Sequence, residues 1–177
     1  MNSAVKLLLI VRDPVVRAIS DWHQLDLKRQ RLGNHSIPFE RQVLRRDGSV
    51  NGSAGVIERS KYCVFYKQWT ELFSPRQIHI VDGDKFTKDP PAELQKIEEF
   101  LQLPRELTPD KFVFSKEKGF FCLIRSNASA NPKCLGESKG REHPYIAPSI
   151  IDKLREYFTK FNRRFSKFTE QTFEWLD

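Results

Sequence analysis

The sequence predicts an α/β protein built on a parallel sheet. Short apolar segments of strand length alternate with longer segments in which apolar residues recur at helical spacing. A strand, helix, strand, helix order of this kind is typical of parallel sheets with crossover helices. Because no repeat or low-complexity linker divides the 177 residues, we expect a single domain over 1–177.

The chain opens with a predicted strand that leads directly into a helix. Residues 5–11 form a near-continuous apolar run, which fits a strand buried on both faces. Asp13 and Pro14 then provide an N-cap and a first-turn proline, and apolar residues recur at helical spacing as far as Leu25. Arg12 is left at the carboxyl end of the strand, where open α/β sheets bind their ligands.

The remaining elements are predicted from the same signals. Their order is a break at 33–38, a short helix near 39–44, a loop over 47–55, a long helix over 56–73, a strand over 77–82, a helix from Asp89 that Pro104 stops, an extended stretch over 111–123 and a terminal helix over 148–165. The apolar positions that mark the first of the two middle helices are Tyr62, Phe65, Tyr66, Trp69, Leu72 and Phe73. The residues expected to face inward in the second are Leu94, Ile97, Phe100 and Leu101.

The charge favours an anionic partner. There are 30 Lys and Arg residues against 23 Asp and Glu, a net charge of +7, and the isoelectric point is near 9.4. Charge alone does not choose among nucleic acid, a phosphonucleotide, acidic lipid and a sulfated glycan. The sequence has no RNP aromatics, helix-turn-helix signature or zinc-ligand spacing, so we expect neither a nucleic-acid partner nor a metal. The longest aliphatic run, 7–11, is too short to cross a bilayer, and this chain is expected to be soluble.

Cysteines and glycosylation acceptors point to the secretory lumen. A bridge between Cys122 and Cys134 would close a polar loop of about a dozen residues and stabilise the fold by roughly 3 kcal/mol. Cys63 lies in an apolar pattern and is expected to be buried. The acceptor asparagines of three Asn-X-Ser motifs are Asn34, Asn51 and Asn127. Disulfides and N-glycans both belong to that compartment.

A basic tripeptide follows the cysteine pair. Lys139, Gly140 and Arg141 place two cations around a glycine, so that two side chains and a backbone N–H can meet one phosphate or sulfate. The alternative is an ordinary solvated tripeptide, and the residues alone do not exclude it.

A second anion-type element lies near the N-terminus. Ser20 is four residues before Gln24, so both lie on one face of the predicted helix that follows Arg12. A serine hydroxyl and an arginine fork can share one phosphate. In the alternative interpretation Arg12 pairs with Asp13 or Asp21, and Ser20 is a plain surface residue.

Together these motifs resemble the heparan sulfate glucosamine 3-O-sulfotransferases, Golgi enzymes of the sulfotransferase fold. The matching pattern is a strand followed by RDP-x5-S-D-x2-Q, then IHIVDGD, then KGF-x-C and CLGESKGR-x-HP. It covers nearly the whole chain, and the combination is highly specific although each piece alone is not. The resemblance implies a parallel-sheet, P-loop NTPase-like fold. It also implies transfer of a sulfuryl group from 3′-phosphoadenosine 5′-phosphosulfate to the 3-hydroxyl of a glucosamine in heparan sulfate, with no metal.

The resemblance implies roles for single residues as well. Arg12 and Ser20 would hold the 3′-phosphate of the donor, and Gln24 would contact the acceptor glycan. Asp21 is expected to orient its neighbours rather than to act as a base. The loop that covers the nucleotide would consist of Lys139, Gly140, Arg141, Glu142 and His143.

The segment before that loop also matches the family. Phe121, or its neighbour Phe120, would pack on the adenine, and Cys122 and Cys134 correspond to the family's disulfide. The departure lies at the beginning, because sulfotransferases of this kind have a lysine-containing loop for the 5′-phosphosulfate and a base glutamate before the RDP strand. Only four residues precede Val5 here, and neither feature is among them.

We therefore expect an N-terminally incomplete domain whose catalytic residues are unknown. Its folding is expected to be marginal, because a missing first strand would expose a sheet edge. The full-length protein is expected to be a type II membrane protein of the Golgi lumen, whereas this chain carries no anchor.

Two function hypotheses remain, with nucleic-acid binding as a weaker third. The first is a domain of a heparan sulfate 3-O-sulfotransferase, and the second is a non-catalytic module that binds a sulfated glycan or a nucleotide. Some basic residues either line a glycan path or form a solvated helix face: Lys28, Arg29, Arg31, Arg41, Arg45 and Arg46. A further set on the terminal helix is interpreted as solvated: Lys153, Arg155, Lys160, Arg163, Arg164 and Lys167.

Overall fold

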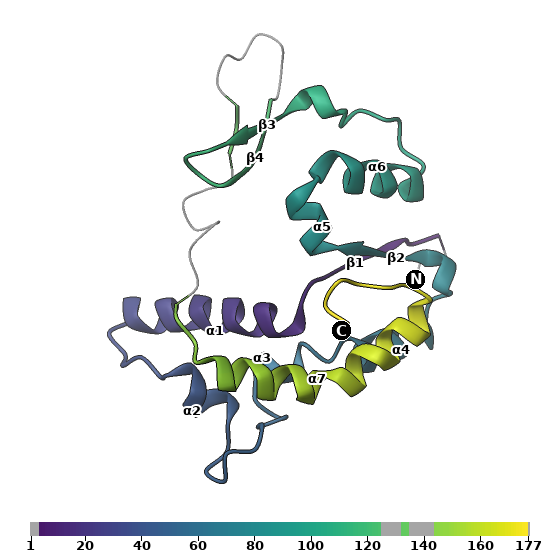
Figure 1. The fold of residues 1–177 in the computed structure, drawn as a ribbon. Coiled ribbons are helices and arrows are strands. Elements are labelled where there is room, and N and C mark those ends of the chain that lie inside the picture. Colours follow the sequence, from purple (N-terminus) through teal and green to yellow (C-terminus); the bar gives the residue numbers. More distant parts are fainter. Residues whose placement is uncertain (1–3, 125–131, 135–143, 177) are drawn as a thin grey trace. The chain divides into compact units, whose positions relative to one another are not determined.

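Figure 1 shows the computed structural model of the chain, which describes residues 4–124, 132–134 and 144–176. The chain divides into two compact units that alternate along the sequence. The strand unit comprises Met1–Val11 and Ser74–Glu142, and the helical unit comprises Arg12–Phe73 and His143–Asp177. No described helix is both long and apolar enough to cross a membrane.

The strand unit is built on two parallel strands. β1 (Leu7–Val11) pairs with β2 (Ile78–Asp82) in a register that runs from Leu7 opposite Ile78 to Val11 opposite Asp82. The amide of Gln77, in the single turn η1 (Pro75–Gln77) before β2, donates to the Val5 carbonyl at 2.8 Å. Both strands end at the same edge, which confirms the predicted parallel pairing.

Two helices follow β2, and the first of them was not predicted. α5 (Gly83–Lys88) begins where Asp82 accepts hydrogen bonds from the backbone N–H groups of Asp84 and Lys85. α6 (Pro90–Leu101) is capped by Asp89. The expected inward residues of α6 are only partly buried: Leu94, Ile97, Phe100 and Leu101.

Acidic side chains take the most buried positions of α6. Glu98 is buried because it accepts hydrogen bonds from the N–H groups of Glu106 and Leu107, at 3.1 and 3.0 Å, and so holds the chain that leaves the helix. Glu93 is buried beside Lys96, with which it forms an ion pair. The apolar periodicity therefore predicted the helix but not its most buried side chains.

An antiparallel hairpin completes the strand unit. After the turn η2 (Pro109–Lys111), β3 (Phe112–Ser115) pairs with β4 (Phe120–Leu123), as expected for an extended stretch. Gly119 has φ 71° in the connecting turn, a conformation that favours glycine. Cys122 on β4 forms a disulfide with Cys134.

The described helices of the helical unit, labelled in Figure 1, are α1 (Pro14–Arg31), α2 (Phe39–Val43), α3 (Gly55–Glu58), α4 (Tyr62–Thr70) and α7 (Pro148–Thr169). α1, α2, α3 and α7 contribute to one apolar core. α7 packs on both α1 and α4. The core residues are Val15, Ala18, Ile19, Trp22, Phe39, Val43, Ala54, Val56, Ile57, Ile146, Ile150, Leu154 and Phe158.

The single long helix predicted over 56–73 is wrong. The chain leaves helical geometry at Lys61, whose ψ is 64°, so α3 and α4 are separate. Ser60 lies at this break with its hydroxyl 3.0 Å from the Pro14 carbonyl and 3.2 Å from that of Val56. Some of the apolar residues that marked the predicted helix are exposed: Phe65, Trp69 and Leu72.

Candidate functional site

The candidate site starts where β1 passes into α1. Arg12 directly follows β1, and its backbone carbonyl accepts a hydrogen bond from the Tyr62 hydroxyl at 3.0 Å. Asp13 caps α1, because its Oδ1 accepts from the N–H groups of Val15 and Val16 at 2.7 and 3.2 Å. The backbone on both sides of the Arg12 side chain is therefore fixed.

Tyr62 remains a proton donor at any physiological pH. Its ring is buried among Phe165 and Trp175. Burial raises the pKa of Tyr62 to about 12, even though the charges of Arg17 and Arg12 oppose that rise. The hydroxyl that holds the end of β1 is thus neutral and available to donate.

Ser20 and Gln24 lie on a face of α1 that points away from the core. The buried residues of the helix are Pro14, Val15, Ala18, Ile19, Trp22 and Asp26. Ser20 is partly exposed and Gln24 is exposed, and the four-residue spacing puts them in one row with Val16. The structure therefore leaves both side chains accessible on the helix that Arg12 precedes.

Asp21 is engaged by two arginines, neither of which is Arg12. Arg59 Nη2 lies 2.8 Å and Arg17 Nη1 lies 3.3 Å from Asp21 Oδ2. Arg17 also donates from Nε to the Ser60 hydroxyl at 2.7 Å and from Nη2 to the Val56 carbonyl at 2.6 Å. Asp21 thus contacts arginines from α1 and from the end of α3, and its expected orienting role stays a prediction.

Arg17 was not singled out from the sequence. Its role is to fasten α1 to the α3 segment, through the contacts with Val56 and Ser60. The four-residue spacing from Arg17 to Asp21 is a helical ion-pair signal that was available in the sequence. Its partners in α3 were not, because they depend on the tertiary fold.

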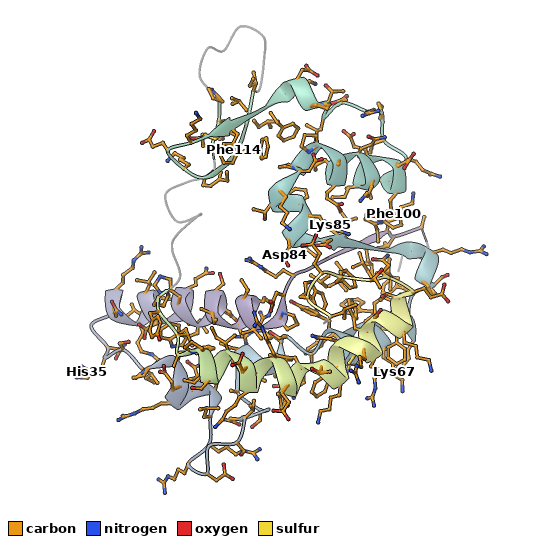
Figure 2. The ribbon with its side chains drawn as sticks, in the orientation of Figure 1. His35, Lys67, Asp84, Lys85, Phe100 and Phe114 are labelled. Carbon is orange, nitrogen blue, oxygen red and sulfur yellow. A yellow bond between two sulfur atoms is a disulfide. The ribbon has the colours of Figure 1, made fainter. Side chains whose placement is uncertain are left out.

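Phe121 belongs to the hairpin of the strand unit. Its ring meets that of Phe114, which Figure 2 labels, edge to face with centroids 5.3 Å apart. Phe114 is half exposed. Phe121 itself is partly buried, and the next residue, Cys122, is fully buried in the disulfide-bonded part of β4. An accessible aromatic surface therefore lies beside the disulfide.

The other expected site residues divide into described and undescribed ones. Asn34 is exposed, and the side-chain oxygen of Asn51 accepts from the Ser53 hydroxyl at 2.9 Å. Within the described ranges no group of three or more acidic, His or Cys side chains could hold a metal ion. The expected residues outside the described ranges are Asn127, Lys139, Gly140, Arg141, Glu142 and His143.

Comparisons with known proteins all match this chain to sulfotransferases. The sulfotransferase domain family model matches residues 1–171. Heparan sulfate glucosamine 3-O-sulfotransferase 5 of Homo sapiens is 40% identical over 176 residues, which are 99% of this chain and 50% of that protein. Heparan sulfate glucosamine 3-O-sulfotransferase 3B1 of Homo sapiens is 38% identical over 176 residues, which are 99% of this chain and 44% of that protein.

A solved structure extends the comparison to the fold. The crystal structure of a sulfotransferase from Alicyclobacillus acidocaldarius matches with a TM-score of 0.64 at 15% identity, over 97% of this chain and 57% of that chain. This likeness confirms the predicted α/β sulfotransferase fold. The chain spans about half the length of the curated relatives it matches.

Proposed function

The chain belongs to the sulfotransferase domain family, and from this premise we propose that it forms the 3′-phosphate-binding part of a heparan sulfate glucosamine 3-O-sulfotransferase. The reaction is the transfer of a sulfuryl group from 3′-phosphoadenosine 5′-phosphosulfate to the 3-hydroxyl of a glucosamine in heparan sulfate. The observation that carries this proposal is Arg12, fixed between β1 and the capped start of α1, with Ser20 partly exposed on that helix.

In this chain, side chains are better placed to bind a phosphate than the first N–H groups of α1 are. Helix N-termini commonly bind phosphate with their first N–H groups, but Asp13 already occupies those of Val15 and Val16. The Arg12 fork and the Ser20 hydroxyl are the groups that would meet the 3′-phosphate, and Phe121 would pack on the adenine. Lys139, Gly140 and Arg141 are proposed to cover the nucleotide.

The donor supplies the sulfuryl group, and the residues of this chain bind and orient it. In such a transfer negative charge spreads over the oxygens of the moving group, so positioned cations stabilise the transition state. Gln24, one helical turn beyond Ser20, is proposed to contact the acceptor glycan. Asp21 is engaged by Arg17 and Arg59, so its proposed role is to position α1 rather than to remove the hydroxyl proton.

Nucleotide binding tests the proposal directly. Titration calorimetry with 3′-phosphoadenosine 5′-phosphate should show binding by the chain, and Arg12→Ala should weaken it at least about tenfold, because a charged hydrogen bond contributes roughly 1.5–3 kcal/mol. Arg105→Ala, which removes an exposed arginine elsewhere, is the matched control and should bind normally. Equal affinities for all three proteins would rule out Arg12 as a phosphate ligand.

A transfer assay separates the two function hypotheses. Labelled sulfate transferred from the donor to heparan sulfate by the 177-residue chain would establish a complete catalytic site in it. Nucleotide binding without transfer would support the hypothesis that this chain is a non-catalytic binding module. The proposed 3′-phosphate-binding role of Arg12 would still hold.

We also propose a Golgi-lumen location, with a membrane anchor in the full-length protein. The disulfide and the exposed Asn34 acceptor support passage through the secretory pathway. If the chain is directed into that pathway in cultured cells, peptide N-glycosidase treatment should increase its gel mobility. Unchanged mobility would show that the acceptor sites are not used.

A further inference from the structure

α7 presents an exposed row of cations along its outer face. Lys153, Lys160, Arg164 and Lys167 follow each other at spacings of seven, four and three residues, which place them on one side of a helix, with Arg163 beside the row. All five side chains are exposed. From Lys153 to Lys167 the row extends about 21 Å along the helix axis. We call these five residues the α7 cationic row.

The positive charge of this row is not neutralised locally. α7 contains six Lys and Arg residues and two acidic ones, a net charge of +4 of the +7 of the chain. None of the ion pairs within the described residues involves a cation of α7. Even Glu156 and Lys160, at the spacing of a helical ion pair, do not form one. Lys160 Nζ lies instead 5.2 Å from the centre of the Phe161 ring and 5.5 Å from that of Tyr157.

The surface on both ends of the row is hollowed. One hollow of about 390 Å³ is lined by Lys153 and Lys160, by Glu156 between them, and by Tyr157 and the 48–50 segment. The Gly48 carbonyl there accepts a hydrogen bond from Lys153 at 3.2 Å. The other, of about 590 Å³, is lined by Arg163 and Lys167 with Thr159, Ser166 and Leu176. The row thus offers two concave, cation-lined places rather than one flat helix surface.

A membrane surface does not fit this arrangement. Helices that lie on membranes insert an apolar face between the lipids. The apolar face of α7 is already occupied, because Leu154, Phe158 and Phe165 are buried in the helical unit. Apart from the exposed Phe168 near the end of the helix, what remains accessible is an elongated cationic face, which suits an extended polyanion whose charges repeat along its length.

We propose that the α7 cationic row binds a sulfated glycan chain outside the donor site. The identity of the polyanion rests on the proposed function, since the relatives named above carry heparan sulfate in their names. The guanidinium group of arginine can donate two parallel hydrogen bonds to sulfate oxygens, as it does to phosphate oxygens. A second contact of this kind makes long glycan chains bind more tightly than short ones, because two linked contacts reinforce each other.

The test removes three charges from the row and three from elsewhere. The row variant is Arg163→Gln/Arg164→Gln/Lys167→Gln, and the matched control is Lys67→Gln/Arg105→Gln/Lys116→Gln, all at exposed positions. With long heparan sulfate chains as the probe, the row variant should lose at least about tenfold in affinity, and the slope of log affinity against log salt should fall by roughly two. The control should lose less than about threefold.

Several outcomes would overturn the proposal. These are equal losses for the row variant and the control, equal affinity for fully desulfated chains, or tighter binding to phosphatidylserine vesicles or single-stranded DNA than to heparan sulfate. The single variant Lys167→Glu provides a second test if the triple variant fails to fold, which far-ultraviolet circular dichroism would show. It should weaken heparan sulfate binding by at least about threefold.

Nucleotide binding distinguishes this proposal from the proposed function. The row variant should bind 3′-phosphoadenosine 5′-phosphate as tightly as the unsubstituted chain. Arg12→Ala should show the reverse pattern, with nucleotide binding weakened at least about tenfold and binding to long heparan sulfate chains retained. If the unsubstituted chain binds heparan sulfate through the row but binds no nucleotide, the proposed function fails while the row stands.

Discussion

At the scale of residues, the candidate site depends on side chains that position Arg12 without touching a ligand themselves. Tyr62 holds the Arg12 carbonyl, and Asp13 holds the first N–H groups of α1. Arg17, fixed by Ser60 and the Val56 carbonyl, fastens the next turn of the helix. The backbone that carries the Arg12 side chain is therefore held by three neighbours in the helical unit.

Removing one of these supports should weaken nucleotide binding. Tyr62→Phe keeps the ring packed against Phe165 and Trp175 but leaves the Arg12 carbonyl without this donor. A hydrogen bond of this kind contributes about 1 kcal/mol, so we expect a loss of up to about fivefold in affinity for 3′-phosphoadenosine 5′-phosphate and a similar loss of stability. Titration calorimetry and urea unfolding measure the two effects.

The matched control is Tyr66→Phe, one helical turn later. Tyr66 is also buried and also packs on Phe165, but it does not contact the Arg12 carbonyl. Its substitution should leave nucleotide affinity unchanged. If both variants weaken binding equally, the effect comes from the aromatic cluster and not from the hydrogen bond to Arg12.

At the scale of elements, sequence patterns predicted what depends on local signals. The apolar run of β1, the Asp13 and Pro14 start of α1 and the Pro148 start of α7 are local, and the structure has all three. The separation of α3 from α4 was missed, because it depends on Ser60 meeting Pro14, which lies 46 residues earlier. α5 was missed because a six-residue helix has no apolar period to detect.

The same distinction applies to the site. Two features of the site could be predicted because they depend on spacing along one segment. Arg12 follows a strand, and Ser20 and Gln24 share one helix face. The contacts of Tyr62 with Arg12 and of Arg59 with Asp21 join residues 50 and 38 positions apart, and only the fold reveals them. The cationic character of α7 was visible in the sequence, and its cations are exposed as predicted, but the hollows at its two ends depend on the tertiary fold.

The packing of β2 against α6 gives the strand unit a pH dependence. His79 on β2 stacks on Phe100 of α6, which Figure 2 labels, with ring centres 5.1 Å apart. Its Nε2 is buried and has no hydrogen-bond partner among the described residues. Burial lowers the pKa of His79 from its ordinary value of 6.5; Glu93 acts in the opposite direction and Lys96 in the same one.

The sign of the pH effect follows from this shift. Below pH 6.5 the unfolded chain takes up a proton at His79 that the folded chain resists, so the free energy of unfolding falls as the pH falls from 6.5 through the lower pKa of the folded state. His79→Phe keeps the stacking on Phe100 and should remove this part of the pH dependence. Urea unfolding followed by far-ultraviolet circular dichroism between pH 7.5 and about pH 5 measures it.

An exposed histidine provides the control. His35, labelled in Figure 2, lies on the surface between α1 and α2 of the helical unit. His35→Phe should leave the pH dependence of the unsubstituted chain unchanged. If His79→Phe also leaves it unchanged, protonation of His79 is not its source.

At the scale of the whole molecule, the two units share one chain that passes between them three times. Neither unit can be cut out as a continuous segment. The aromatic side chains divide unevenly, because every Trp and Tyr residue lies in the helical unit: Trp22, Trp69, Trp175, Tyr62, Tyr66, Tyr145 and Tyr157. The disulfide, in contrast, lies in the strand unit. Breaking the disulfide therefore perturbs the strand unit, whereas tryptophan fluorescence reports on the helical unit.

This separation allows a test of the single-domain prediction. Reducing the Cys122–Cys134 disulfide should destabilise the chain by about 3 kcal/mol, which for a chain of this size lowers the unfolding midpoint by roughly 6–12 °C. If the interleaved units unfold as one, tryptophan fluorescence, which reports only on the helical unit, should record the full shift and coincide with far-ultraviolet circular dichroism. A Cys122→Ser/Cys134→Ser variant should behave like the reduced chain, and reducing agent should not shift it further. A fluorescence midpoint that stays in place while the circular dichroism transition splits would show two independently unfolding domains, because the loss of the bridge would then be confined to the strand unit.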